Sequence, residues 1–300
     1  MKYKLLTEKK SDRALLSGVN PWLFFILALG LSWTFWIPMI FIPGEPMSFP
    51  LILLTILGGL GPAAAEFVLI FFHGEESLRR DYFLRIFDFR RIRWTWAVGI
   101  LVLFPLLNAA ATGLSVLSGG PEPTWDTVRE FLNRPLSLIP YLIVMFLFGP
   151  LPEELGWSGY ALDGLQQKRS ALTSSLIIGA VWAVWHLPLF FVEGTFQHDQ
   201  IGFATPAFWW FMLPTLPISI LDTWMYNNNG RSTLAAVLLH FMVNLSGELF
   251  NLSSRARFFQ LVLLLLFTAF VVIYWGPDQL TGAKSDRPGR ALVPGAEVTG

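Results

Sequence analysis

Long apolar runs recur along the chain, and they constrain the fold more than any other feature of the sequence. A helix that crosses the hydrocarbon of a bilayer needs about 20 predominantly apolar residues. Backbone groups in lipid must find partners within the chain, so each run is expected to be helical. The eight expected spans are residues 21–42, 49–72, 94–117, 137–162, 171–192, 203–226, 232–252 and 258–275.

The composition agrees with a chain that lies in lipid. Hydrophobic residues make up 54% of the chain and charged residues 14%, whereas a soluble domain is about 25% charged. Basic and acidic residues number 21 each, which gives no sign of a nucleic-acid partner. The chain has no cysteine, which excludes disulfides and thiol chemistry. The sequence therefore predicts an all-α, polytopic membrane protein with about eight transmembrane helices.

The cations predict how these spans are oriented. With the N-terminus inside, 17 of the 21 Lys and Arg residues fall in segments that would face the cytoplasm. The remaining four are Arg129, Arg134, Arg255 and Arg257. Cytoplasmic loops carry an excess of Lys and Arg, so both termini are expected in the cytoplasm.

Three regions are expected along the chain. Residues 1–18 form a cytoplasmic N-terminal segment, residues 19–276 a single membrane domain, and residues 277–300 a disordered tail rich in Gly, Pro and charge. Residues 81–93 alternate Arg with large apolar residues. They are expected to form either an amphipathic helix on the inner leaflet or an ordinary positively charged loop.

Ionisable side chains occur inside several apolar runs, where each costs roughly 2.5–3.5 kcal/mol at the centre of a span. Glu153 and Glu154 are adjacent in the fourth run, and His186 follows Trp182 by one helical turn in the fifth. A carboxylate pair suits general-base chemistry, but it also suits a helix end at a water-filled vestibule. A lone histidine such as His186 is more often a satisfied core residue than a catalytic group.

The seventh run carries His240 and Asn244 at a four-residue spacing, so the imidazole and the amide project from one helix face. The alternative is an interhelical hydrogen-bond cluster. Brought together, a carboxylate and an imidazole can deprotonate a water, while the other imidazole and the amide donate to an oxyanion. This chemistry is amide hydrolysis without a covalent intermediate. Zinc held by Glu153, His186 and His240 is the alternative.

Three motifs in order carry a family resemblance. They are Glu-Glu-Leu-Gly-Trp-x-Gly-Tyr-Ala-Leu at 153–162, Trp-x-x-x-His at 182–186 and His-x-x-x-Asn at 240–244. Together they resemble the CPBP family, which comprises type II CAAX prenyl endopeptidases and the bacteriocin-processing and self-immunity (Abi) proteins. The resemblance covers roughly residues 50–275, with a core at about 135–252.

The resemblance implies an eight-helix intramembrane endopeptidase. Glu153 and His186 would activate the attacking water, His240 and Asn244 would form the oxyanion hole, and Glu154 would support the site. No cofactor is expected, although zinc stays an alternative. The implied substrate is a membrane-associated or lipid-modified protein or peptide, and the implied opening of the cavity is toward the cytoplasm. Self-immunity members imply a bacterial cytoplasmic membrane.

One position departs from the family pattern. The family has an arginine five residues after the first glutamate, where this chain has Ser158. Serine cannot form an ion pair with Glu154 one turn earlier, so Glu154 is expected to be protonated or held by hydrogen bonds. The departure keeps open a catalytically degenerate, non-enzymatic immunity or binding protein. A transporter that uses Glu66 and Asp222 is a further alternative, but no inverted repeat supports it.

Overall fold

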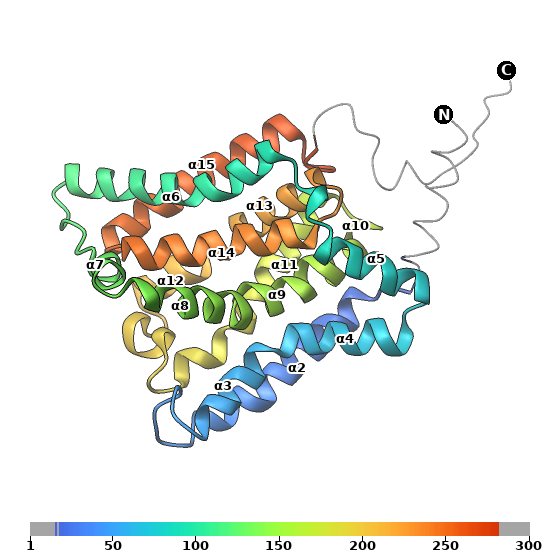
Figure 1. Ribbon diagram of the computed structural model, residues 1–300, viewed down its shortest axis with the longest axis horizontal. Helices are drawn as coiled ribbons and strands as arrows, with labels where there is room; N and C mark the ends of the chain where they lie inside the picture. The colour runs from blue at the N-terminus through green and yellow to red at the C-terminus, as the bar shows by residue number, and fades with distance from the viewer. Residues whose placement is uncertain (1–15, 17, 282–300) are drawn as a thin grey trace, which may run out of the picture.

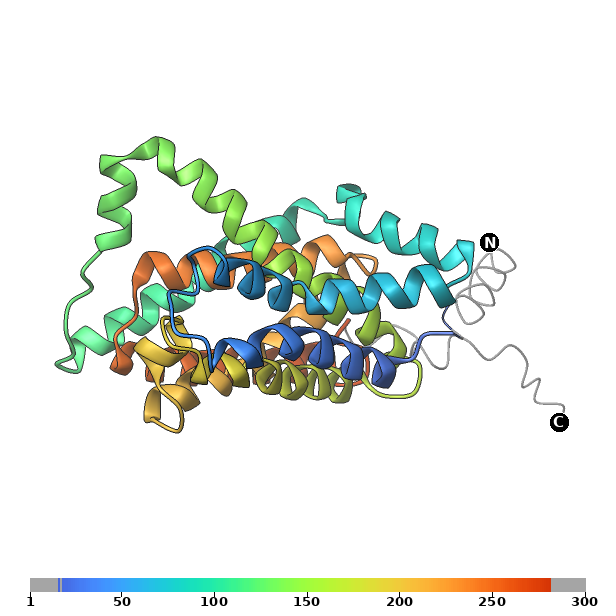
Figure 2. The same ribbon diagram turned by 90° about the horizontal axis from the view of Figure 1, so that it is seen from below.

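The computed structural model describes residue 16 and residues 18–281, and within this part all regular structure is helical. The helices pack as an elongated bundle in which most axes run along its long direction (Figures 1 and 2). Most of the predicted N-terminal segment and most of the predicted tail lie outside the described residues. The prediction of an all-α membrane protein is confirmed.

Five of the expected spans are single long helices. Asn20, Ser170, Ser232 and Ser253 cap four of them, because each side chain accepts hydrogen bonds from otherwise unpaired N–H groups of the first turn. The third span has the predicted bounds. The helices are α2 (Pro21–Met39), α6 (Trp94–Leu117), α11 (Ala171–Trp185), α14 (Thr233–Phe250) and α15 (Ser254–Trp275).

The second expected span is a bent pair, α3 (Leu51–Gly59) and α4 (Gly61–His73), with 52° between the two helices. Small residues at the bend bring it close to α2. A Cβ on Gly58 would lie 2.1 Å from the indole Nε1 of Trp36, and one on Gly61 would lie 2.0 Å from Ser32 Oγ. Larger residues would therefore push the bend away from α2.

The fourth expected span is interrupted where the glutamate pair lies. The break falls at Gly149, which precedes Pro150, and a five-residue π-helical turn follows the glutamates. Proline cannot donate the hydrogen bond that would continue the preceding helix. The pieces are α8 (Pro135–Phe148), α9 (Pro150–Gly156), η2 (Trp157–Ala161) and α10 (Leu162–Gln166).

The expected span at 203–226 is not a single membrane-crossing helix. The chain forms α12 (Pro206–Met212) and α13 (Thr215–Asn228), which are separated at Leu213 and Pro214. Eleven of the fourteen residues of α13 are buried, and α13 packs between α11, α14 and α15. The described part therefore has six helices that could cross a membrane, or up to seven with the bent pair, where about eight were predicted.

Short helices cover the two ends of the bundle. Residues 277–281, which were predicted to begin the tail, pack against the bundle instead: the carbonyls of Pro277 and Asp278 accept from the backbone of α11, and Leu280 is buried. The predicted tail therefore begins too early. The end helices are α5 (Glu76–Phe87), η1 (Phe89–Arg91), α7 (Asp126–Asn133), η3 (Leu187–Phe191) and η4 (Gln197–Ile201).

Candidate active site

Glu153 lies on α9, just after the break at Gly149, and its side chain is almost fully buried. Its Oε2 accepts a hydrogen bond of 2.7 Å from the indole Nε1 of Trp182 on α11. An indole N–H can only donate, so Trp182 fixes one oxygen of the carboxyl group and leaves the other for a further partner.

His186 follows the last residue of α11, and its ring is held by the same tryptophan. Its Nδ1 lies 2.9 Å from the backbone carbonyl oxygen of Trp182. A carbonyl oxygen can only accept, so Nδ1 carries the proton and Nε2 keeps its lone pair. Trp185 and Phe211 meet the imidazole edge to face, with ring centroids 4.8 Å and 5.2 Å away. These contacts give the ring one defined orientation.

His240 on α14 pairs with the second glutamate. Its Nδ1 lies 3.1 Å from Oε1 of Glu154, and its ring centroid lies 4.9 Å from that of Trp182. With Nδ1 engaged by Glu154, Nε2 is the nitrogen available to another partner.

Glu154 is held by two hydrogen bonds, which is one of the two states predicted for it. The Ser158 hydroxyl donates to Oε2, and His240 occupies Oε1. Glu154 and Ser158 line a second, small chamber of about 10 Å³, which is the space of roughly one water molecule. Asp222 on α13 lines the same chamber, and its Oδ1 has no hydrogen-bond partner among the described residues.

A cavity of about 730 Å³ joins the other predicted site residues, a volume within the range of about 300–1,000 Å³ typical of ligand pockets. Glu153, His186, His240 and Asn244 all line this cavity. The structure therefore brings together four of the five predicted residues, from three expected spans. Glu154 does not line it and lies behind His240, which suits the supporting position predicted for it.

The residues present do not form a metal site in this arrangement. Among the described residues, no group of three or more His, Asp and Glu side chains is placed to hold a metal ion. The alternative zinc ligands Glu153, His186 and His240 share the cavity without that geometry.

Trp182 and Asp222 are the contributions that sequence reasoning missed. From the sequence, Trp182 is known only to share a helix face with His186. Asp222 enters there only as a possible part of the ion path of a transporter. A glutamate and an indole 29 residues apart leave no periodic signal of their hydrogen bond. Glu66 on α4 is buried, but it lines neither the cavity nor the chamber.

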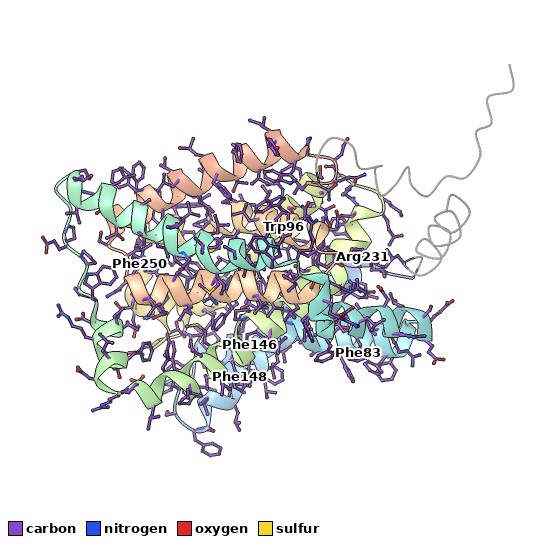
Figure 3. All side chains as sticks on the ribbon, turned by 45° about the horizontal axis from the view of Figure 1, so that its top comes forward. Phe83, Trp96, Phe146, Phe148, Arg231 and Phe250 are labelled. Atoms are coloured by element: carbon purple, nitrogen blue, oxygen red, sulfur yellow. The ribbon has the colours of Figure 1, made fainter. Side chains whose placement is uncertain are left out.

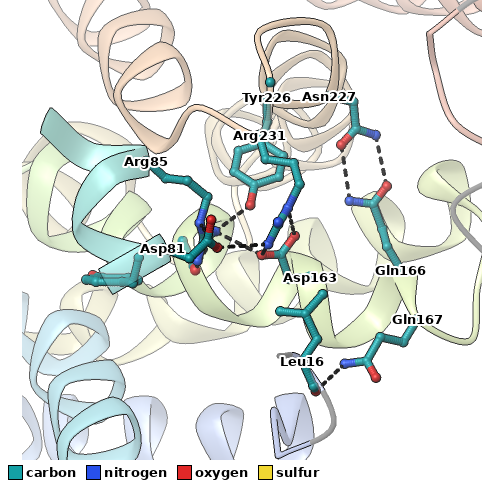
Figure 4. Close-up of polar contacts among 12 residues, drawn as sticks. Leu16, Asp81, Arg85, Asp163, Gln166, Gln167, Tyr226, Asn227 and Arg231 are labelled. Atoms are coloured by element: carbon teal, nitrogen blue, oxygen red, sulfur yellow. Dashed lines mark hydrogen bonds and ion pairs between the residues drawn. The ribbon is translucent and has the colours of Figure 1, made fainter. Parts of the chain in front are cut away.

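A buried ion cluster lies just beyond the site along the same interrupted helix (Figure 4). Asp163 on α10 accepts from Arg85 Nη1 at 2.8 Å and from Arg231. Arg85 also donates to the hydroxyl of Tyr226 at 2.6 Å and pairs with Asp81 at 2.9 Å. Burial opposes the charge of Arg231, but the facing Asp163 raises the pKa of the guanidinium above its usual value.

Arg85 thus differs from both predictions for its segment. The segment does form a helix, α5, but Arg85 is 1% exposed and faces the bundle, away from headgroups and solvent. Its Nη1 also donates to the carbonyl of Gly159 at 3.1 Å, within the π-helical turn. The cluster therefore anchors the segment that follows the glutamate pair.

Two comparisons with known proteins cover the region of this site. A family model described as type II CAAX prenyl endopeptidase Rce1-like matches residues 135–246, a range that includes all five predicted site residues. The chain is 27% identical over 259 residues to CAAX prenyl protease 2 of Methanococcus maripaludis, which covers 85% of this chain and 94% of that protein. The chain is thus similar to type II CAAX prenyl endopeptidases over these ranges, as its motifs predict.

Proposed function

We propose that the protein is an intramembrane endopeptidase that hydrolyses a peptide bond in a membrane-associated or lipid-modified substrate. One observation carries the proposal: Glu153, His186, His240 and Asn244 line one cavity inside a helical membrane domain. Their hydrogen bonds leave one carboxyl oxygen and two imidazole Nε2 atoms for a water and a substrate.

In the proposed first step, Glu153 and His186 hold a water between them. The water gives a proton to Glu153, and its oxygen forms a bond to the carbonyl carbon of the substrate. Nε2 of His186 accepts the second O–H of that water and so orients it. The electron pair of the carbonyl moves onto its oxygen, which becomes an oxyanion.

His240 and Asn244 are proposed to stabilise that oxyanion, with Nε2–H and the side-chain amide as donors. The tetrahedral intermediate then collapses: the C–N bond breaks, and the proton on Glu153 passes to the leaving amine. Donors placed in advance contribute about 2.7–4 kcal/mol each in comparable sites. Glu154 is a positioning residue that keeps His240 protonated and oriented.

Substrate class and location follow from the relatives and the setting. The archaeal relative is named as a CAAX prenyl protease, so we propose a peptide beside a lipid or another apolar anchor as the substrate. The enzyme would work in the cytoplasmic membrane of a bacterium as a multi-pass protein, without a metal or another cofactor.

The test compares purified wild type with Glu153→Gln, both reconstituted in liposomes. The probes are an S-farnesylated CAAX peptide and a peptide carrying a transmembrane anchor, and mass spectrometry detects new termini. Glu153→Gln should lower the rate by about 10²–10⁴-fold, as expected for the loss of a general base. Glu66→Gln is the matched control, because Glu66 is a buried carboxylate outside the cavity.

Two results would overturn the proposal. The first is equal product from wild type and Glu153→Gln, which would place the activity elsewhere. The second is no product from either probe with folded wild type, which would favour a non-enzymatic immunity or binding protein.

A further inference from the structure

Within the described part of the chain, the cavity reaches only one end of the bundle. From Glu153 and His240 its lining continues to Thr127 on α7, Gln197 on η4 and Asn251 after α14. None of its lining residues comes from α5, α10 or the α13–α14 connection. A substrate therefore reaches the site from the end that carries α7.

Contacts define the two ends. The α7 end comprises residues 40–50, 118–134, 192–205 and 251–257. Here Trp125 packs on Phe250 with ring centroids 5.3 Å apart, and Arg255 donates to the carbonyl of Ser118. The α5 end comprises residues 74–93, 167–170 and 229–232, and contacts of Arg231 with Asp81 and of Arg91 with the carbonyl of Gly230 join the first of these segments to the last. Arg231 and Phe250 mark the two ends in Figure 3.

The two ends differ in charge. Among the described residues, the α5 end holds the four acids Glu75, Glu76, Asp81 and Asp88 and nine cations: Arg79, Arg80, Arg85, Arg90, Arg91, Arg93, Lys168, Arg169 and Arg231. The α7 end holds the four arginines Arg129, Arg134, Arg255 and Arg257. It also holds the six acids Glu45, Glu122, Asp126, Glu130, Glu193 and Asp199. Since Lys and Arg accumulate on the cytoplasmic side, the α5 end is the cytoplasmic one.

We infer that the cavity opens on the extracytoplasmic face, and that its substrate is a membrane-anchored peptide presented on that face. This is opposite to the cytoplasmic opening implied by the family resemblance. The side of access rests on the cavity and the charges, while the nature of the substrate rests on the proposed function.

The lining explains why the substrate is anchored. Tyr141, Val144, Met145 and Phe148 line the cavity from α8, and none of the residues of α8 is buried in the bundle. The same helix thus borders both the cavity and the lipid. An apolar anchor in the outer leaflet can lie along α8 while the adjoining peptide enters beside Thr127.

The chain lacks cysteine, so single cysteines report the side of access directly. Thr127→Cys lies at the cavity mouth, Thr124→Cys on the exposed loop beside it, and Ser77→Cys on the exposed face of α5. Intact cells that express each full-length variant are treated with a membrane-impermeant maleimide, before and after permeabilisation. We expect Thr124→Cys and Thr127→Cys to react in intact cells and Ser77→Cys only after permeabilisation.

Labelling of Ser77→Cys in intact cells, with the other two protected, would overturn the inference, and so would labelling of all three. Cysteine labelling does not depend on turnover. If Glu153→Gln left hydrolysis unchanged, the proposed function would therefore be wrong, but the inferred side of access would still stand. In proteoliposomes sorted by this labelling, the anchored peptide added outside should be cut only where the α7 end faces outward. Cutting only where the α5 end faces outward would again contradict the inference.

Discussion

Trp182 holds both Glu153 and His186, the two side chains proposed to activate the water. Its indole N–H donates to Glu153 at 2.7 Å, and its backbone carbonyl accepts from His186 at 2.9 Å. Glu153 and His186 come from different expected spans, and nothing in their sequence positions requires them to lie at one depth. One tryptophan of α11 sets the orientation of both.

Replacing the indole donor should slow hydrolysis without unfolding the protein. Trp182→Phe keeps an aromatic ring but removes the hydrogen bond to Glu153, and such bonds to charged groups are worth about 1.5–3 kcal/mol. We expect kcat to fall about 10- to 100-fold with little change in KM. Trp185→Phe is the matched control, because Trp185 donates to Ser32 instead. Equal losses in both variants would mean that Trp182 only packs.

A cation at position 158 should compensate the acids of the small chamber. Ser158→Arg would place a guanidinium beside Glu154 and Asp222, so hydrolysis per folded molecule should stay or rise. The chamber is small, so thermal unfolding should show a stability loss of about 1–3 kcal/mol from overpacking. Ser158→Met adds bulk without charge and serves as the control. A clear loss of hydrolysis with Arg alone would contradict the pairing argument.

The same substitution in two buried aspartates should have opposite effects on stability. Asp163→Asn removes the buried carboxylate that pairs with both Arg85 and Arg231 and leaves them only the partly exposed Asp81, which should cost about 3–5 kcal/mol of unfolding free energy. Asp222→Asn removes a carboxylate whose Oδ1 lacks a partner among the described residues, so stability should be unchanged or higher. Denaturant unfolding of both variants checks this. A matching loss in both would refute the distinction.

Hydrolysis should persist after metal removal. Treatment with 1,10-phenanthroline and dialysis should leave the rate unchanged, because the described His, Asp and Glu side chains form no group placed to hold a metal. The rate is measured before and after treatment, with zinc added back in a parallel sample. Inhibition that zinc reverses would favour the alternative with Glu153, His186 and His240 as ligands.

The sequence predicts the continuous helices best. Residues 94–117 match α6 because an uninterrupted apolar run in lipid has no competing structure. Residues 203–226 are equally apolar, yet Pro214 and the burial of α13 make them two helices. Hydropathy reports only that a segment avoids water, and it does not distinguish lipid from the inside of a bundle.

The sequence predicts those residues of the site that lie in its three motifs. Glu153, His186, His240 and Asn244 follow from residue type and spacing, and the structure places them on one cavity. Asp222 carries no such pattern, because its relation to Glu154 depends on how α13 packs beside η2. Arg85 looked like one of many surface cations, since only tertiary packing turns it inward to Asp163.

The π-helical turn at Trp157–Ala161 separates two functions of one interrupted helix. Before the turn, the helix carries Glu153 and Glu154 at the candidate site; after it, Asp163 faces Arg85 and Arg231. A π-helical turn advances fewer degrees per residue than an α-helix, so it rotates everything downstream relative to Glu153 and Glu154. Removing one residue from the turn would leave a continuous helix, but it would rotate Asp163 away from the guanidinium groups of Arg85 and Arg231. Chain length in this stretch is therefore as tightly constrained as the identity of the glutamates, and variation should favour substitutions over insertions or deletions.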